Sequence, residues 1–230
     1  MSGFNVLFVA VALSVAGLGL LRQLPPQQSP LAPLSLADPI GWTTAGKLRQ
    51  LAGETEPCHL LLTRSSVSFR PVPNRSEGDF CGYAGAVALP GEPAVYAGGP
   101  VQVSCPLAAA LTLWQRDVVG PAAKRHLGNG VRRIEHAGSY ACRRVYGSKM
   151  GAVSQHASAN AIDITGFRLA DGRVISVAND WSGTDESRRA FLRDVRDGGC
   201  RLFSGVLGPD YNVEHRDHFH LDMGLYRVCR

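Results

Sequence analysis

The stretch SQHASANAIDITGFRLADGRVISV, residues 154–177, combines a strand pattern with two candidate metal ligands. Two alternating segments flank Asp171-Gly172, a dipeptide typical of a tight hairpin turn, so we predict two antiparallel strands here. His156 lies in the loop before the first strand, and Asp163 lies inside that strand. Side chains from such a loop and such a strand can converge on one point, and both residues are therefore candidate ligands.

A second polar cluster, EHRDHFHLDMG, occupies residues 214–224. Side chains alternate between the two faces of an extended strand, so this segment has a polar face and an apolar face. Phe219 and Leu221 form the apolar face and are predicted to enter the core. The residues of the polar face, which we expect to look into a cleft, are His218, His220 and Asp222.

The two clusters together predict a metal site. Zn²⁺ prefers imidazole nitrogens and carboxylate oxygens as ligands, and a catalytic zinc site keeps one coordination position open. From spacing alone, the three ligands would be His156, Asp163 and either His218 or His220. The remaining histidine would lie beside the metal ion.

The N-terminus contains an uncharged apolar run, FNVLFVAVALSVAGLGLL, over residues 4–21. Its 18 residues just reach the length that crosses a bilayer core. A cleaved signal peptide would have a positive residue before the run and a small-residue cleavage site after it, and neither is present. We therefore predict a transmembrane anchor over residues 1–22, with a cleaved signal segment as the alternative.

Residues 23–40 are rich in Pro, Gln and Ser and are predicted to form an extended spacer, a linker without packed structure. The rest of the chain has an ordinary apolar content and is long enough for one domain with a sizeable core. We divide it into an N-terminal part, residues 41–104, and a core, residues 105–230, which contains both candidate ligand clusters.

Hydrophobic periodicity predicts the main elements of the folded part. The strongest helix pattern covers residues 105–128, with Trp114 on its buried face and Pro121 as a break. A second helix is expected over residues 184–199, with its first residue, a threonine, as the N-cap. Residues 59–73 are expected to form one or two strands. Together these elements predict an α+β domain, a small antiparallel sheet with helices on one side.

Six dispersed cysteines predict disulfides. No CxxC pair is present, so a thiolate zinc site is not expected. Behind an apolar N-terminus, dispersed cysteines in even number are typical of an oxidising compartment. Six cysteines allow 15 pairings. We predict Cys200–Cys229, because this bond would tie the end of a helix at Gly199 to the chain terminus.

The charge distribution limits the classes of partner. The formal net charge of +5 is compatible with contact to an anionic polymer. The arginines are scattered and are not interleaved with aromatic residues, so no nucleic-acid binding is predicted.

The stretch SQHASANAID resembles the S-x-H-x-x-G-x-A-x-D signature of zinc peptidases related to D-alanyl-D-alanine carboxypeptidases, lysostaphin and the zinc-binding domain of hedgehog proteins. In this signature Ala159 replaces the glycine, and the matching residues are Ser154, His156, Ala161 and Asp163. HRDHFH resembles the closing motif of the murein endopeptidase branch of that group. From about Cys58 to Met223, the chain is similar to the bacterial extensin-like C-terminal domain. The supporting stretches are CPLAAALTLW, RIEHAGSYACR, SQHASANAIDITGF and LGPDYNVEHRDHFHLDM.

This resemblance implies a zinc peptidase core of the hedgehog and D-Ala-D-Ala peptidase type, in which His156, Asp163 and His220 hold one zinc ion. It leaves His218 near the metal as the general base, with Asp217 as the alternative. Residues 41–104 would then form the N-terminal part of the extensin-like domain, and residues 105–230 the zinc peptidase-like core.

The resemblance also implies two further site residues. His215 matches a polar site position of the endopeptidase branch. GSYACRR resembles a Ser-Gly-Tyr-Arg stretch in which an arginine steadies the substrate oxyanion, and Arg143 is the candidate, with Arg144 as the second choice.

The predicted function is that of a zinc-dependent peptidase that cleaves peptidoglycan peptides in the cell envelope by zinc-activated water. The domain would be exported to the periplasmic side of the cytoplasmic membrane, anchored there, or soluble if the N-terminus is cleaved. One alternative is a catalytically inactive zinc-binding module that binds the cell wall, and another is a structural envelope protein without a metal. No oligomeric state is predicted.

Overall fold

The computed structural model describes residues 9, 11, 19, 21, 23–91 and 95–230. The predicted membrane anchor or signal segment, residues 1–22, lies largely outside the described residues. Within the described part of the chain, no helix has both the length and the apolar character needed to cross a membrane.

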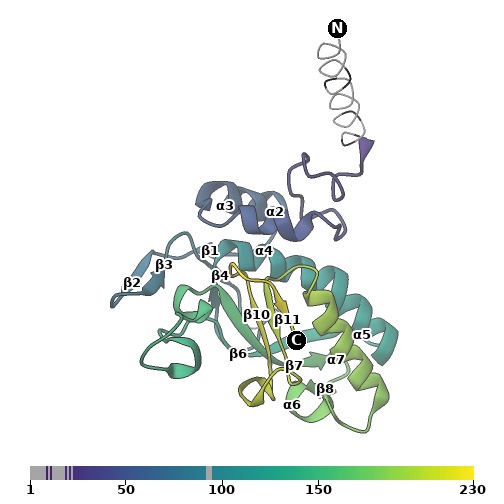
Figure 1. The fold of residues 1–230 in the computed structure, drawn as a ribbon. Helices are drawn as coiled ribbons and strands as arrows, with labels where there is room; N and C mark the ends of the chain where they lie inside the picture. Colours follow the sequence, from purple (N-terminus) through teal and green to yellow (C-terminus); the bar gives the residue numbers. More distant parts are fainter. Residues whose placement is uncertain (1–8, 10, 12–18, 20, 22, 92–94) are drawn as a thin grey trace.

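A central sheet organises the fold (Figure 1). Its strand order is β11-β9-β10-β7-β6, with β8 paired to β7. Neighbouring strands are antiparallel, apart from β11, which runs parallel to β9. The strand bounds are β6 Val131–Gly138, β7 Ala161–Leu169, β8 Val174–Ser176, β9 Gly205–Leu207, β10 Phe219–Asp222 and β11 Val228–Cys229. The predicted hairpin at Asp171-Gly172 is therefore present as β7 and β8, and the predicted last strand, β10, is followed by one more.

The main core lies between this sheet and three helices, α4 Cys105–Trp114, α5 Gly120–Leu127 and α7 Glu186–Gly199 (Figure 1). Trp114 is fully buried, as predicted, and contacts the rings of Phe167 and Phe203. Its indole N–H donates to the Val195 carbonyl of α7 at 3.0 Å, so the polar edge of the ring is also satisfied. The architecture is mixed α+β with small antiparallel sheets, as the sequence predicts.

The helix pattern of residues 105–128 is interrupted next to Pro121, as predicted. Proline lacks the N–H that would bond the preceding turn. A π-helical turn, η1 Gln115–Val119, separates α4 from α5, and the Gly120 N–H bonds the Gln115 carbonyl five residues back. Gly128 ends α5 in the left-handed conformation, with φ of 66°.

The predicted strand at residues 59–73 is wrong in its first half, which belongs to the helix α3 Thr55–Arg64. Cys58 and Leu62 lie one helical turn apart and are both buried, whereas Leu60 is half exposed. Only Arg70–Pro71 forms a short strand, β1. Helix α3 and helix α2, Thr44–Gln50, stack against α4 on the side away from the sheet (Figure 1).

Two small sheets complete the N-terminal part. The first has the order β1-β4-β5, where β4 is Val87–Leu89 and β5 is Val101–Val103. The second pairs β2, Arg75–Glu77, with β3, Cys81–Tyr83. Both sheets are antiparallel.

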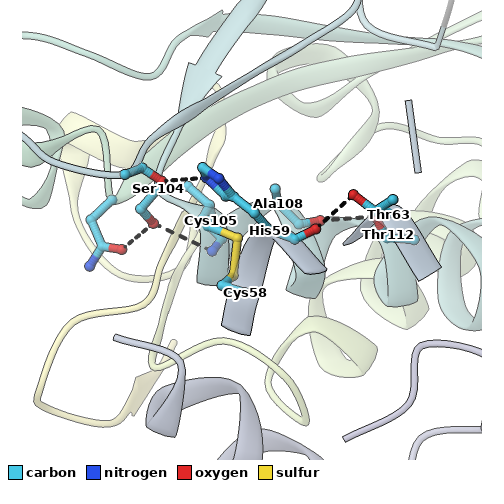
Figure 2. Close-up of a disulfide and its surroundings, with 10 residues drawn as sticks. Cys58, His59, Thr63, Ser104, Cys105, Ala108 and Thr112 are labelled. Carbon is cyan, nitrogen blue, oxygen red and sulfur yellow. Dashed lines mark hydrogen bonds between the residues drawn. A yellow bond between two sulfur atoms is a disulfide. The ribbon is translucent and has the colours of Figure 1, made fainter. Parts of the chain in front are cut away.

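Three disulfides join separate elements, and the predicted pair Cys200–Cys229 is among them. It ties the end of α7 to β11. Cys58–Cys105 joins α3 to the start of α4, where Ser104 caps the helix and also bonds Asn160 (Figure 2). The third bond links strand β3 to the loop after β6 through Cys81–Cys142.

Residues 23–40 are not the unpacked spacer that their composition predicts. Ser29 and Leu36 are buried. The Lys47 ammonium donates to the Pro26 carbonyl at 2.7 Å, and the Arg116 guanidinium donates to the carbonyls of Leu36 and Asp38. Prolines remove N–H donors from such a segment but leave its carbonyls as acceptors, and these carbonyls bond side chains of α2 and η1.

Helix α7 begins one residue later than predicted. Its N-cap is Asp185 rather than Thr184, and the Asp185 carboxylate accepts the Arg188 N–H at 3.1 Å. A carboxylate satisfies an orphan N–H and also interacts favourably with the positive end of the helix dipole.

Because Trp114 fills the centre of the core, Trp114→Ala should lower the free energy of unfolding by about 3–5 kcal/mol. Trp42 is 70% exposed, so Trp42→Ala should change it by no more than about 0.5 kcal/mol. Urea denaturation followed by circular dichroism measures both. Equal effects of the two substitutions would contradict the assigned core.

Candidate metal centre

Three side chains from separate elements meet on the face of the sheet opposite the core. Asp163 lies on β7, His220 on β10, and His156 on the short helix η3, Gln155–Ser158. The antiparallel register pairs His220 directly with Asp163. His156 Nε2 lies 3.2 Å from Asp163 Oδ1 and 3.1 Å from His220 Nδ1, and the last two atoms are 3.0 Å apart. Among the described residues, these three form a group that could hold a metal ion.

The loop that carries His156 is held by local contacts. The Ser154 hydroxyl accepts the His156 N–H at 3.3 Å and caps η3. Ala159, at the position where the resembled signature has glycine, adopts the left-handed conformation with φ of 53°. A residue with a Cβ pays about 1–2 kcal/mol for this conformation, so alanine keeps the glycine-like path of the loop at a modest cost.

Hydrogen bonds select one nitrogen of each histidine for the centre. The Nδ1–H of His156 donates to the Ser139 carbonyl at 2.8 Å, which leaves Nε2 as a lone pair facing Asp163. The Nε2–H of His220 donates to Asp222 Oδ2 at 3.1 Å, which leaves Nδ1 facing the same point. Metal-binding histidines in proteins are oriented by such partners, a carbonyl or a carboxylate on the second nitrogen. The donor set therefore fits a metal ion.

Two glycines accommodate the Asp222 carboxylate. The Gly224 N–H donates to Asp222 Oδ1 at 2.7 Å. A Cβ on Gly205 would lie 2.0 Å from Asp222 Oδ2, so only glycine leaves room for the carboxylate there. The strand pattern places Asp222 on the polar face, but sequence reasoning assigned it no role and missed Gly205 altogether. The alternation of β10 carried a signal for Asp222, whereas Gly205 lies on another strand.

The charges of the centre are coupled. Burial would raise the pKa of Asp163, but hydrogen bonds with His156 and His220 outweigh it and hold this pKa far below its usual range. Burial would lower the pKa of His220, but hydrogen bonds with Asp163 and Asp222 raise it to about 9. Without a metal ion, the His220 ring is therefore held protonated between two carboxylates, and a metal ion that binds its Nδ1 would displace that proton.

His218 lies beside the triad and has an orienting partner of its own. Its Nε2 is 3.6 Å from Asp163 Oδ1, while its Nδ1–H donates to Asp217 Oδ1 at 2.8 Å. The Asp217 side chain is half exposed and faces His218 rather than the triad. Asp217 is therefore placed to orient His218. Of these two candidate bases, His218 is the residue that faces the triad.

His215 is buried on the other side of His218. It lies on the short helix η4, Val213–His215, and its ring centroid is 5.2 Å from that of His218 and 5.9 Å from that of His220. Burial, followed by the neighbouring His218 and His220, lowers the pKa of His215 to about 4. At neutral pH this ring is therefore uncharged.

A cleft of about 320 Å³ opens over the triad. Arg143 lines it, together with the helical turn η2, Val145–Gly147. Arg144 points elsewhere: its guanidinium stacks 4.6 Å from the Phe80 ring centroid and donates to the Gly151 carbonyl. Of the two candidate arginines, only Arg143 is brought to the cleft.

Mixed α+β architecture with a His-Asp-His triad in an open cleft defines a protein with a candidate mononuclear metal centre. Residues 56–230 match the family model described as extensin-like protein C-terminus, and the chain belongs to this family. No curated protein matches the chain, and no solved structure matches it.

We expect Gly205→Ala to displace the Asp222 carboxylate and so leave the His220 ring without its acceptor. The affinity for Zn²⁺ should fall about 10–100-fold although all three ligands remain. Competition with a chromophoric chelator measures this change. Gly46→Ala is the matched control, because a Cβ at Gly46 meets no atom within 4 Å. A folded Gly205→Ala protein with unchanged zinc affinity would contradict the role of Asp222.

Proposed function

We propose that this protein is a zinc-dependent peptidase that acts on peptidoglycan peptides. The observation that carries the proposal is the convergence of His156, Asp163 and His220, with the Asp217–His218 pair beside them. Three ligands and a separate oriented base are the parts that a hydrolytic metal site requires. The motif resemblance to zinc peptidases supports the same reaction.

The donor set favours zinc among common metal ions. Two imidazole nitrogens and one carboxylate are typical of catalytic zinc. Ligand atoms about 2.1 Å from a tetrahedral ion lie about 3.4 Å from one another, and the three atoms here are 3.0 to 3.2 Å apart. When bound, zinc supplies Lewis-acid polarisation of a carbonyl and activation of water.

The side chains around the triad would supply the proton transfer and the stabilisation of the oxyanion. His218 Nε2 accepts the proton of the attacking water, and Asp217 keeps the proton of the ring on Nδ1. Arg143 donates N–H groups to the oxygen of the scissile carbonyl as negative charge develops on it. His215 is uncharged and buried beside His218, so it contributes a polar contact without adding a positive charge.

The substrate class and the location are inferred from the same features. Three disulfides support an oxidising compartment, and the apolar N-terminal segment supports export to the periplasmic side of the cytoplasmic membrane. Peptidoglycan lies in that compartment. The open cleft and the positive Arg143 at its side fit an extended peptide with carboxylates.

A zinc-binding cell-wall module without catalysis is the second candidate, and one observation favours it. His218 Nε2 lies only 3.6 Å from Asp163 Oδ1, near enough for a small ring movement to make it a fourth ligand. Four protein ligands would close the coordination sphere, as in structural zinc sites.

The full chain, incubated with cross-linked murein, should release altered muropeptides in a zinc-dependent way. Chelation should abolish the change and added Zn²⁺ should restore it, because the proposed reaction needs the Lewis acid that zinc supplies. Chromatography of the digested murein measures the products. An unchanged muropeptide profile with zinc-loaded protein would refute the peptidase proposal.

His218→Ala distinguishes the two candidates. If His218 is the base, the variant should bind Zn²⁺ as tightly as the native protein but hydrolyse about 10²–10⁴-fold more slowly. Metal analysis after dialysis, together with the murein assay, gives both quantities. Lost zinc in His218→Ala, combined with no hydrolysis by the native protein, would favour the binding module.

The two arginines provide a matched pair. Arg143→Ala should reduce kcat by about 10²–10³-fold because an oxyanion donor is removed. Arg144→Ala removes the same charge at the next position, but the Arg144 guanidinium stacks on Phe80 and bonds the Gly151 carbonyl instead of lining the cleft, so hydrolysis should fall much less than in Arg143→Ala. Equal losses in the two variants would show that charge alone, rather than placement in the cleft, matters.

A further inference from the structure

The cleft has two walls that come from distant parts of the chain. One wall is the loop between β6 and β7, drawn green in Figure 1, whose residues 143–154 we call the flap. The flap folds back on itself through an isolated bridge between Arg144 and Val153. The Val145 N–H bonds the Ala152 carbonyl at 3.0 Å, and the Ser154 N–H bonds the Arg143 carbonyl at 3.2 Å. The other wall includes Glu214 and His215 of η4.

Tyr146 is the point of the flap that reaches the opposite wall. Its backbone is left-handed, with φ of 56° and ψ of 22°, a conformation that costs a residue with a Cβ about 1–2 kcal/mol. Its ring lines the cleft, and its hydroxyl accepts the Asn212 Nδ2–H at 2.8 Å. Strained residues persist where surrounding contacts hold them, and the bond from Asn212 is such a contact.

The other end of the Asn212 amide holds His215. Asn212 Oδ1 accepts the His215 backbone N–H at 3.2 Å and the His215 Nδ1–H at 2.6 Å. A backbone N–H can only donate, so the amide oxygen must face His215 and the amide nitrogen must face Tyr146. His215 therefore carries its proton on Nδ1, and its Nε2 is left as an acceptor.

We propose that Asn212 is a positioning residue that places the flap and the His215 ring together. One planar amide bonds Tyr146 with its nitrogen and His215 with its oxygen, and it supports the direct contact of the two rings, whose centroids are 6.4 Å apart. The role rests on the proposed peptidase function: a peptide in the cleft would meet the Tyr146 ring on one side. On the other side it would meet the bare Nε2 of His215, an acceptor for a peptide N–H.

Three substitutions in the full chain separate the two bonds. Asn212→Ala removes the bond to Tyr146 and the two bonds to His215. Tyr146→Phe removes the hydroxyl that bonds Asn212 and leaves the amide oxygen on His215. Asn212→Asp is the conservative variant. One carboxylate oxygen still accepts from His215, and the other can accept a hydrogen bond that the Tyr146 hydroxyl donates. Asn179→Ala, on the surface helix α6, Val177–Asp180, is the matched control.

Two measurements report on the bonds of Asn212 to His215 and to Tyr146. Nitrogen chemical shifts of the His215 ring report which nitrogen is protonated, and amide hydrogen exchange at Val145 and Ser154 reports flap opening. In Asn212→Ala, the His215 ring should no longer prefer its proton on Nδ1. Amide exchange at Val145 and Ser154 should become about three- to tenfold faster, which corresponds to the loss of one hydrogen bond. Tyr146→Phe should speed exchange by a similar factor and leave the ring unchanged. Asn212→Asp should keep both readouts near native values.

Native exchange and native ring shifts in Asn212→Ala would overturn the proposal, as would changes of the same size in Asn179→Ala. Neither readout needs zinc or hydrolysis. A failure of the peptidase function would therefore appear as missing zinc-dependent hydrolysis with both readouts as expected. A failure of the positioning role would appear in the readouts themselves.

Discussion

The antiparallel pairing of β7 with β10 is the constraint on which the rest of the centre depends. Its register sets His220 opposite Asp163 and, on the reverse face, Phe219 opposite Ile164 and Leu221 opposite Ile162. The same hydrogen bonds therefore build the metal ligands and the apolar core. A slip of one residue would move every side chain of one strand to the other face. The slipped form would bury a charged histidine and expose a phenylalanine, so the core enforces the geometry of the centre.

Each histidine around the triad has a partner that fixes its orientation. A backbone carbonyl holds His156, and the carboxylates of Asp222 and Asp217 hold His220 and His218. Because these bonds come from the protein alone, the ring nitrogens face one point without help from an ion. Preorganisation of this kind reduces the reorganisation that binding would otherwise require. Gly205 belongs to this arrangement, because the absence of its side chain leaves space for the Asp222 carboxylate.

The sequence could predict what depends on local pattern and no more. Alternation identified the polar face of β10, the Asp171-Gly172 turn identified the hairpin, and the position of Gly199 identified the pairing of Cys200 with Cys229. The run of leucines at 60–62 was assigned to a strand, because a short apolar run does not distinguish a strand from one face of a helix. The roles of Gly205 and Asn212 depend on residues that pack against them from elsewhere in the chain, and no local pattern encodes such contacts.

The packing of residues 23–39 limits the distance that can separate the cleft from the N-terminal segment. As a free chain, these 17 residues could extend about 56–61 Å. Ser29 and Leu36 are buried, and carbonyls of the segment accept bonds from Lys47 and Arg116, so the segment is packed on the domain and not free to extend to that length. If residues 1–22 anchor the protein, as their sequence predicts, this packed segment would hold the cleft close to the membrane. It would then reach only the layer of the wall nearest the membrane.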